Sequence, residues 1–554
     1  MKSIRENLCC DLLFKTVEFG NVRFIDDLTE WRSGFHSHMP RDRFNALRLP
    51  VSAVWVIVWV ACALSGATSA RGDDPAIALE NSLVKVIEQS EPAVVSIAKI
   101  RPVPYEPRVV LKPLERMDGP PTDPEHPDFQ PNSYGVGVII AGVRPAEKFV
   151  LTNYHVVQGG PVFAKTTPGE VLLQQTGDGT SLFIRFADRR SCYASIIAAD
   201  PRSDLAVLHL ELTDAKINAD DLKTLDWTVS SPIRKGQLVM MLGNPYSLAH
   251  DGSASASWGM ISNVARRPLP WTDERQNRTV MYRLGSLIQI DGRLNLGTSG
   301  GPLLNLKGEL VGITTSLAAI EGYEKSAGFA IPLDDLTRRI VKSLVSGHEV
   351  EYGMLGISPS TVTFSELSSY DIGVKQASAV KVERVATDSP AQRAGISFND
   401  IILSVKGIPI LSDFDLMRVV GLQPPEEPVE IVVWNDKNGR FTVKAILSKW
   451  SVLDDEGIIE TSPRHPAWRG ISVDYPTGRK KYHKEDDRYR RAVVVTKVAP
   501  DSPAQATGLQ PGMFIAEVNR IPVQTPNEFV EAVKGAKGKV ELRLWEGGRL
   551  AIGE

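Results

Sequence analysis

Residues 296–305 read LGTSGGPLLN, and the question they raise is whether Ser299 is a nucleophile or a residue in a turn. Glycines on both sides of Ser299 let the backbone take conformations that other residues avoid. A tight curl of this kind points successive N–H groups at one place, where an anion can bind. Acyl-transfer chemistry needs such donors beside a nucleophilic serine, whereas a hairpin turn needs only the glycines. The stretch alone leaves both interpretations open, and a base and an acid elsewhere in the chain would decide between them.

The length and composition limit the classes of protein to consider. A chain of 554 residues is too long for one hydrophobic core and indicates about three or four domains. The formal net charge of −3 gives no basis for a nucleic-acid partner, which normally requires a basic surface. No pair of cysteines or histidines has metal-ligand spacing, so we expect neither a metal nor a cofactor.

An apolar run near the N-terminus predicts export. Residues 51–64, VSAVWVIVWVACAL, follow three arginines and precede the small residues SGATSA. That order is typical of a secretory signal peptide, which we place at 39–70. An uncleaved inner-membrane anchor is the alternative, and it is the one membrane association we expect. Residues 1–38 are then interpreted as a non-native extension or a mis-assigned translation start, with Met39 as the true start. Removal of the signal would leave Cys192 as the one cysteine.

The C-terminal part contains a repeat. Residues 382–410, VERVATDSPAQRAGISFNDIILSVKGIPI, match residues 495–523, VTKVAPDSPAQATGLQPGMFIAEVNRIPV. Each copy continues with the spacing of a helix capping box, Ser412 with Asp415 and Thr525 with Glu528. The repeat therefore predicts two tandem domains, at 351–450 and 462–554.

Both copies resemble PDZ domains, which bind the C-terminus of a peptide in a loop before an edge strand. The matching loops are YGMLGI and AWRGIS, although their glycines could also mark only strand starts. The charge-rich stretch 478–491 interrupts the second copy, and we interpret it as a solvated hairpin, with a polyanion contact as the alternative. The resemblance implies these peptide-binding residues: Tyr352, Gly353, Met354, Leu355, Gly356, Ile357, Trp468, Arg469, Gly470 and Ile471.

Two further segments offer a base and an acid for Ser299. His155 directly follows a hydrophobic strand in LTNYHVV, residues 151–157. Asp204 begins the alternating strand of DPRSDLAVL, residues 200–208. Each residue alone could be structural, because single histidines often are and aspartate is a common turn former. Together they give the chain order His, Asp, Ser, which is the order in chymotrypsin and not that of the α/β-hydrolases or subtilisin.

With LGNPYSL at 242–248 and GFAIP at 328–332, these motifs resemble the HtrA/Deg family of trypsin-like serine proteases. The resemblance implies a mainly β fold, in which a chymotrypsin-like double β-barrel at 135–345 is followed by the two PDZ domains. Residues 71–100 would lead into the protease domain, and the proline-rich segment 101–134 would form a loop or arm. In the family, such a region helps to build trimers, so we expect a homo-oligomer.

The resemblance also implies the roles of individual residues. Ser299 would be the nucleophile, His155 the general base and Asp204 the group that orients the imidazole. Backbone N–H groups of Gly297, Thr298 and Ser299 would form the oxyanion hole. The specificity pocket would be formed by Arg293, Leu294, Ile313 and Thr314.

Three positions depart from the family pattern. Arg293 stands where a small residue is usual, Val136 replaces a usual serine, and Thr298 stands where asparagine is frequent. An inward Arg293 would favour acidic side chains of the substrate. We expect an outward one, with Leu294 lining an apolar pocket, because an unpaired buried guanidinium is costly.

The implied function is that of an exported, ATP-independent serine endopeptidase for protein quality control, located in the bacterial periplasm. Its partners would be unfolded polypeptides, and peptide C-termini bound to the PDZ domains would regulate it. The alternative is a PDZ scaffold or chaperone whose protease domain is latent. An esterase of the α/β-hydrolase class would require a GxSxG elbow, which the chain lacks.

Overall fold

The computed structural model describes most of the chain between residues 74 and 554. No helix in this described part is long and apolar enough to cross a membrane. The predictions for 1–38, for the signal at 39–70, for Arg293 and for most of the segment 101–134 fall outside the described residues. These are 74–101, 123–126, 129–165, 171–174, 179–229, 231–244, 251–267, 271–273, 278–280, 285–292, 294–315, 327–370, 372–373, 375–453, 457–482 and 488–554.

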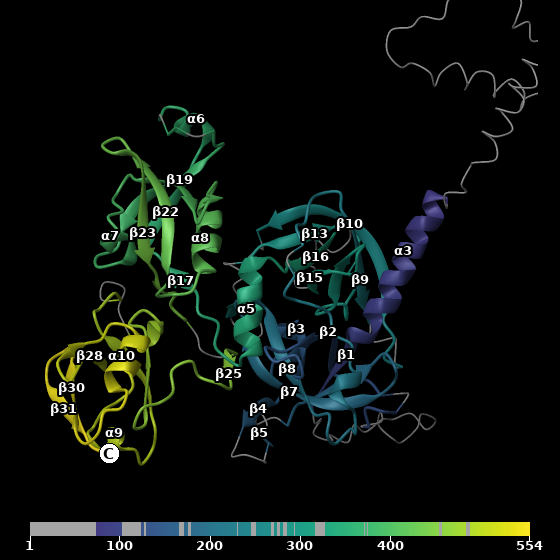
Figure 1. The fold of residues 1–554 in the computed structure, drawn as a ribbon, viewed down its shortest axis with the longest axis horizontal. Helices are drawn as coiled ribbons and strands as arrows, with labels where there is room; N and C mark the ends of the chain where they lie inside the picture. The colour runs from purple at the N-terminus through teal and green to yellow at the C-terminus, as the bar shows by residue number, and fades with distance from the viewer. Residues whose placement is uncertain are drawn as a thin grey trace, which may run out of the picture. The chain divides into compact units, whose positions relative to one another are not determined.

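The first barrel is a closed antiparallel sheet of six strands. Its order is β7-β6-β1-β2-β3-β8, and pairing of β7 with β8 closes it. Strands β1, β2, β3, β7 and β8 of this barrel are labelled in Figure 1. The strand interiors are apolar, and Val150, Ile184 and Leu208 pack in the barrel core. The strands are β1 (Val94–Ile100), β2 (Ser133–Ala141), β3 (Lys148–Asn153), β6 (Ser181–Phe186), β7 (Ser191–Asp200) and β8 (Leu205–Leu210). Two short strands, β4 (Val162–Lys165) and β5 (Val171–Gln174), extend the sheet beside β7.

The second barrel is also closed and has six strands, in the order β10-β13-β16-β15-β14-β9. Val138 of the first barrel and Leu304 of the second belong to one hydrophobic cluster, which joins the two barrels. The mainly β, chymotrypsin-like double barrel expected from the sequence is therefore confirmed. The strands are β9 (Leu238–Gly243), β10 (Ser255–Arg266), β13 (Leu287–Ile290), β14 (Pro302–Asn305), β15 (Leu310–Thr315) and β16 (Gly328–Pro332).

The barrel begins earlier than the expected boundary at residue 135. Strand β1 pairs with both β2 and β6, so Val94–Ile100 is an integral strand and not a leading segment. Helix α3 (Pro75–Ser90) precedes it and buries Val86 against the cluster that joins the barrels. Helix α5 (Asp335–Val345) follows β16. Its N-terminus is capped by the carboxylate of Asp334, which accepts the Thr337 N–H.

Each of the two repeats folds into an antiparallel five-stranded path with a capped helix. In the first, α8 packs against β18 and β20. The first path is β18 (Ile357–Val362), β19 (Ala379–Val385), β20 (Ile401–Val405), β22 (Pro428–Asn435) and β23 (Gly439–Ile446), with α7 (Pro390–Arg393) and α8 (Asp413–Gly421). The second is β26 (Ile471–Asp474), β27 (Val493–Val498), β28 (Phe514–Val518), β30 (Val540–Leu544) and β31 (Arg549–Ile552), with α9 (Pro503–Ala506) and α10 (Pro526–Val533).

The two predicted capping boxes differ in detail. At α10 both reciprocal bonds between Thr525 and Glu528 are present. At α8 the Ser412 hydroxyl accepts the Asp415 N–H, but the Asp415 carboxylate accepts the N–H of Leu411 rather than that of the cap residue. Other short elements are η3 (Glu91–Ala93), α4 (Tyr154–Val157), η4 (Ala219–Asp221), β11 (Trp271–Asp273), β12 (Arg278–Val280), β17 (Gly353–Met354), α6 (Phe364–Leu367), β21 (Ile408–Pro409), β24 (Ser448–Lys449), β25 (Ile459–Glu460), η7 (Lys480–Tyr482) and β29 (Ile521–Pro522).

Candidate active site and peptide groove

The imidazole of His155 is held by the carboxylate of Asp204. The chain turns from β3 into the short helix α4, which carries His155, while Asp204 directly precedes β8, the partner of β3. His155 Nδ1 lies 2.8 Å from Asp204 Oδ2 and 3.0 Å from Oδ1. A carboxylate can only accept here, so Nδ1 carries the proton and Nε2 is left to exchange one with a substrate or nucleophile.

Asp204 is fixed at the backbone as well as at the side chain. It is fully buried and has a positive φ of 55°, which a short polar residue tolerates better than most. Its carbonyl accepts the N–H of Tyr154 at 3.0 Å and the amide of Asn153 at 3.1 Å. Its Oδ1 also accepts the His155 backbone N–H at 3.0 Å. These bonds fix the carboxylate in the orientation that meets the imidazole.

The loop of Ser299 is packed against the strand that leads to the histidine. Ser299 is 2% exposed, and its carbonyl accepts the N–H of Val136 on β2 at 2.8 Å. A Cβ on Gly135 would lie 2.6 Å from the side chain of Val156 and 3.2 Å from the Ser299 carbonyl. Only glycine therefore fits between the serine loop and the helix of His155. The serine, histidine and aspartate come from three remote segments that the double barrel gathers in one region.

The loop before Ser299 is locked by its own hydrogen bonds. Gly297 has a φ of 91°, which suits glycine. The N–H and hydroxyl of Thr298 both donate to the Asn295 carbonyl, at 3.2 and 2.7 Å. The Thr298 carbonyl accepts the Thr314 hydroxyl at 2.6 Å. Because its N–H is engaged inside the turn, Thr298 fits a role in shaping the loop better than the expected role of an oxyanion donor.

The residues expected in the specificity pocket have separate environments. Leu294 packs against the core of the second barrel. Ile313 is buried in the cluster between the barrels. The Thr314 hydroxyl donates to the carbonyls of Thr298 and Gly301, at 2.6 and 3.1 Å, and so contacts both sides of the serine loop.

The first PDZ loop forms one end of a cavity of about 440 Å³ between β18 and α8. The described residues Met354, Leu355, Gly356 and Ile357 line it, and their role in peptide binding stays a prediction.

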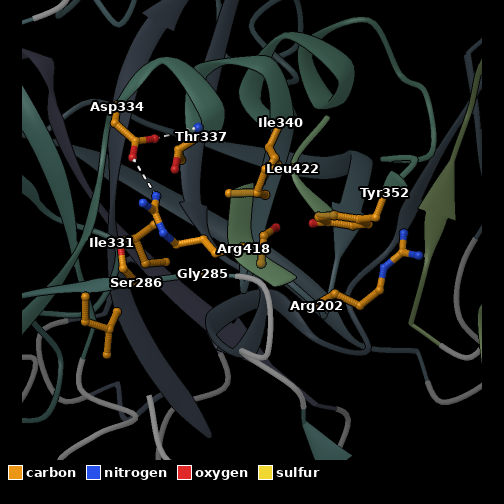
Figure 2. Close-up of a pocket in the computed structure, with 12 residues that line it drawn as sticks. Arg202, Gly285, Ser286, Ile331, Asp334, Thr337, Ile340, Tyr352, Arg418 and Leu422 are labelled. Atoms are coloured by element: carbon orange, nitrogen blue, oxygen red, sulfur yellow. Dashed lines mark hydrogen bonds and ion pairs between the residues drawn. The ribbon is translucent and has the colours of Figure 1, made fainter. Parts of the chain in front are cut away.

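Tyr352 does not belong to this groove, and the prediction that it binds peptide is wrong. Its side chain is buried, and its hydroxyl donates to Asp200 Oδ2, four residues before Asp204. Figure 2 shows its ring beside Arg202, whose guanidinium lies 4.7 Å from the ring centroid. Gly353 instead pairs with Lys449 in the small sheet of β17 and β24.

The residues of the second PDZ loop make hydrogen bonds to one another and to their own domain. Trp468 and Ile471 exchange two backbone hydrogen bonds of 2.9 and 2.8 Å. The Arg469 guanidinium donates to the carbonyls of Gly538, Ile552 and Gly553 at 2.6 to 2.9 Å. The expected peptide ligands Trp468, Arg469 and Ile471 are therefore engaged within their own domain, with Gly470 at a φ of 90° between them.

A buried ion cluster connects both PDZ domains to the protease domain. Lys449 is 2% exposed, and its Nζ lies 3.1 Å from Asp474, 3.2 Å from Glu349 and 3.5 Å from Glu351. Arg479 joins Glu349 and Asp474 from the second PDZ domain. The cations hold the pKa of Glu349 at about 2 against the opposing effect of burial.

The cluster reaches the strand end that precedes Asp204. Arg202 Nη2 lies 3.6 Å from Glu349, and its Nε donates to Asp200 at 2.7 Å. The strand β25, from the segment between the PDZ domains, pairs with β7 of the first barrel. Sequence inspection missed these residues because charged side chains far apart in the chain give no local signal that they meet.

The stretch 478–491 was expected to be a solvated hairpin, and this is wrong for two of its residues. The Arg479 side chain is 14% exposed in the ion cluster, and Tyr489 is 7% exposed. Their burial results from contacts with other domains, which a local charge count cannot show.

Comparisons with known proteins agree with the domain organisation. A trypsin-like peptidase domain matches residues 135–313, and a PDZ domain matches 381–435 and 494–546. A probable periplasmic serine endoprotease, DegP-like, from Pseudomonas fluorescens is 29% identical over 496 residues, covering 84% of this chain and 91% of that protein. The protein of the same name from Ectopseudomonas mendocina is 28% identical, with 84% and 92% covered. A solved structure of the HtrA-type protease AlgW with a decapeptide is 24% identical, covers 66% of this chain and 98% of its own, and has a TM-score of 0.44.

The chain is thus a trypsin-like serine endopeptidase with two C-terminal PDZ domains. The DegP-like names of these relatives agree with the resemblance to the HtrA/Deg family that the sequence motifs indicated.

Proposed function

We propose that this protein is a periplasmic, ATP-independent endopeptidase that cleaves unfolded polypeptides with Ser299 as the nucleophile. The observation that carries the proposal is the bond of 2.8 Å between His155 Nδ1 and the buried carboxylate of Asp204, beside the glycine-flanked serine loop. The names of the relatives support the periplasmic location and the serine endoprotease activity. A cleft that binds extended backbone suits unfolded substrates, because folded proteins seldom expose such a strand.

The steps follow from the roles of the three side chains. Ser299 Oγ attacks the scissile carbonyl while His155 Nε2 takes its proton. The imidazolium is stabilised by Asp204 and returns a proton to the amine that leaves. The N–H groups of Gly297 and Ser299 would receive the oxyanion, a contribution of about 3–4 kcal/mol for each donor. Water then hydrolyses the acyl-enzyme by the same proton transfers in reverse order.

Regulation by peptide C-termini is the second part of the proposal, and the first PDZ domain is the favoured receptor. Its cavity lies along an end strand, where an added peptide strand can pair. The bonds from Lys449 and Glu349 through Arg202 and Asp200 offer a physical connection from the PDZ pair to the loop of Asp204. We also propose a trimer-based homo-oligomer, on the family resemblance alone.

Digestion of reduced, carboxymethylated casein tests the proposal, with cleavage sites mapped by mass spectrometry. We expect cleavage by the wild type and none by Ser299→Ala or His155→Ala. The mapped residues before each cut also test Arg293, because apolar residues would support an outward side chain and acidic ones an inward side chain. Stable trimers that never cleave, with or without free-C-terminal activator peptides, would favour a latent scaffold or chaperone instead.

A further inference from the structure

Part of the wall of the first PDZ groove comes from the second PDZ domain. The cavity between β18 and α8 is lined by Lys480, Arg488 and Tyr489, which belong to the insert at 478–491. The insert is held in place at its base, where the Val452 N–H donates to the Gly478 carbonyl and the Lys480 N–H donates to the Val452 carbonyl, at 2.9 and 3.0 Å. The groove is therefore built by two domains together.

The groove has the two features that an extended peptide needs. Strand β18 is the end strand of its sheet, so one side of it is available for backbone pairing among the described strands. The floor is apolar, with Leu355, Leu416 and Val420 buried beneath it. Leu453 lines the same cavity and remains 60% exposed, which leaves apolar surface for a ligand to cover.

The charged residues that line this apolar floor have one sign in the described part of the chain. Arg384 contributes from β19, and Lys480 and Arg488 contribute from the insert. None of the described residues that line the cavity is acidic. A ligand with several carboxylates therefore complements the groove better than one with a single terminal carboxylate.

Tyr489 ties the insert to the loop that would hold the ligand's terminus. Its phenol ring packs on Gly356, where even a methyl group would collide with the hydroxyl. Gly356 has a φ of 82°, so a side chain is disfavoured there by the backbone as well. The Tyr489 hydroxyl is buried and has no hydrogen-bond partner among the described residues. An unmade bond of this kind is costly, and a carboxylate bound at the loop offers the acceptor after a small shift of the ring.

We propose that the first PDZ groove, completed by Lys480, Arg488 and Tyr489 of the second domain, binds polypeptide C-termini that carry acidic side chains close to the terminal carboxylate. The inference rests on the proposed regulation by peptide C-termini and names the chemistry of the regulator. The second PDZ domain then acts as a specificity element for the first and not as an independent receptor.

The test uses fluorescence anisotropy with the full-length Ser299→Ala protein, which cannot consume the peptides. Three fluorescein-labelled decapeptides end in the same apolar residue and differ at the two positions before it, with two Glu, two Gln or two Lys. A fourth has two Glu and an amidated C-terminus. We expect the Glu peptide to bind about three- to fivefold more tightly than the Gln peptide at 150 mM salt, and this preference to shrink at 1 M salt.

Two variants place the effect in the composite groove. Lys480→Glu should lose the preference for Glu and gain one for Lys, whereas Lys437→Glu, on the loop between β22 and β23, should behave as the parent protein. Tyr489→Ala should weaken all the free-C-terminal peptides alike, while thermal unfolding and circular dichroism report whether the variant is folded.

The outcomes separate the inference from the proposed function. If peptides bind through a free C-terminus but the Glu and Gln forms bind equally, or Lys480→Glu leaves the order unchanged, the inference is wrong, while the binding of C-termini on which the proposed regulation depends is supported. If the amidated and free peptides bind equally or none binds, regulation by C-termini fails, and the inference fails with it.

Discussion

Replacement of Lys449 by methionine should expose how strongly the buried ion cluster binds the domains together. Methionine nearly preserves the volume of the side chain and removes its charge. Lys449 is 2% exposed, and its ammonium lies 3.1–3.5 Å from Asp474, Glu349 and Glu351. After the replacement, Arg479 is the cation that remains within 3.0 Å of this group of carboxylates.

The expected loss of stability comes from the buried carboxylates that would lose the ammonium group of Lys449. Removal of one partner from a buried ion pair costs about 3–5 kcal/mol, because the remaining charge stays buried. For a folding unit of roughly 150–250 residues, each kcal/mol shifts Tm by about 2–4 °C. The transition that includes the PDZ domains should therefore fall by roughly 6–20 °C. A multidomain chain need not unfold in one step, so the shift applies to that transition and not to every one.

Differential scanning calorimetry of the full-length protein measures this shift. Lys444→Met is a matched control, because Lys444 is an exposed residue on β23. A transition temperature of Lys449→Met within about 1 °C of the control would refute the reasoning, since it would mean that the buried charges cost nothing to separate.

Four further outcomes are expected. Tyr352→Phe removes the hydroxyl that donates to the buried Asp200 carboxylate, which should cost about 1.5–3 kcal/mol by calorimetry and lower kcat. Thr314→Val removes both hydroxyl bonds to the serine loop, so peptide-hydrolysis kinetics should show a lower kcat with a nearly unchanged KM. The folded pKa of Glu349, about 2, lies below its unfolded value, so its contribution to stability should be complete above about pH 4.5 and should be lost as the pH falls toward 2, which acid-unfolding curves can follow. Burial raises the pKa of Cys192 to about 12, so iodoacetamide at pH 8 should modify it only after unfolding, as peptide mass spectrometry can show.

Sequence motifs were sufficient for the protease core because its chemistry is concentrated in short segments. The conformation around Ser299 can be predicted from its neighbouring glycines. The position of His155 can be predicted from the hydrophobic strand that precedes it. The order of the three residues then selects the double barrel, which the structure has. Strand β1 was missed because the proline-rich segment separates VVSIAKI from the barrel strands that it joins.

The domain contacts could not be predicted in the same way. Tyr352 stands beside a PDZ glycine loop in sequence, yet its hydroxyl reaches Asp200 of the protease domain. Lys449 and Tyr489 look like ordinary surface residues until the fold brings other domains over them. Tyr352 and Asp200 are 152 residues apart, and Lys449 and Glu349 are 100 residues apart. Local sequence patterns carry no information on such contacts.

Labelling with a fluorophosphonate probe, followed by mass spectrometry of the modified peptide, tests the central claim most directly. Such a probe reacts with a serine only when a base and an oxyanion site activate it. We expect one modification on Ser299 in the wild type and in a Ser262→Ala control, and none in Ser299→Ala or His155→Ala. Absence of labelling in the folded wild type, with and without peptide activators, or equal labelling of His155→Ala, would contradict the claim that His155 and Asp204 activate Ser299.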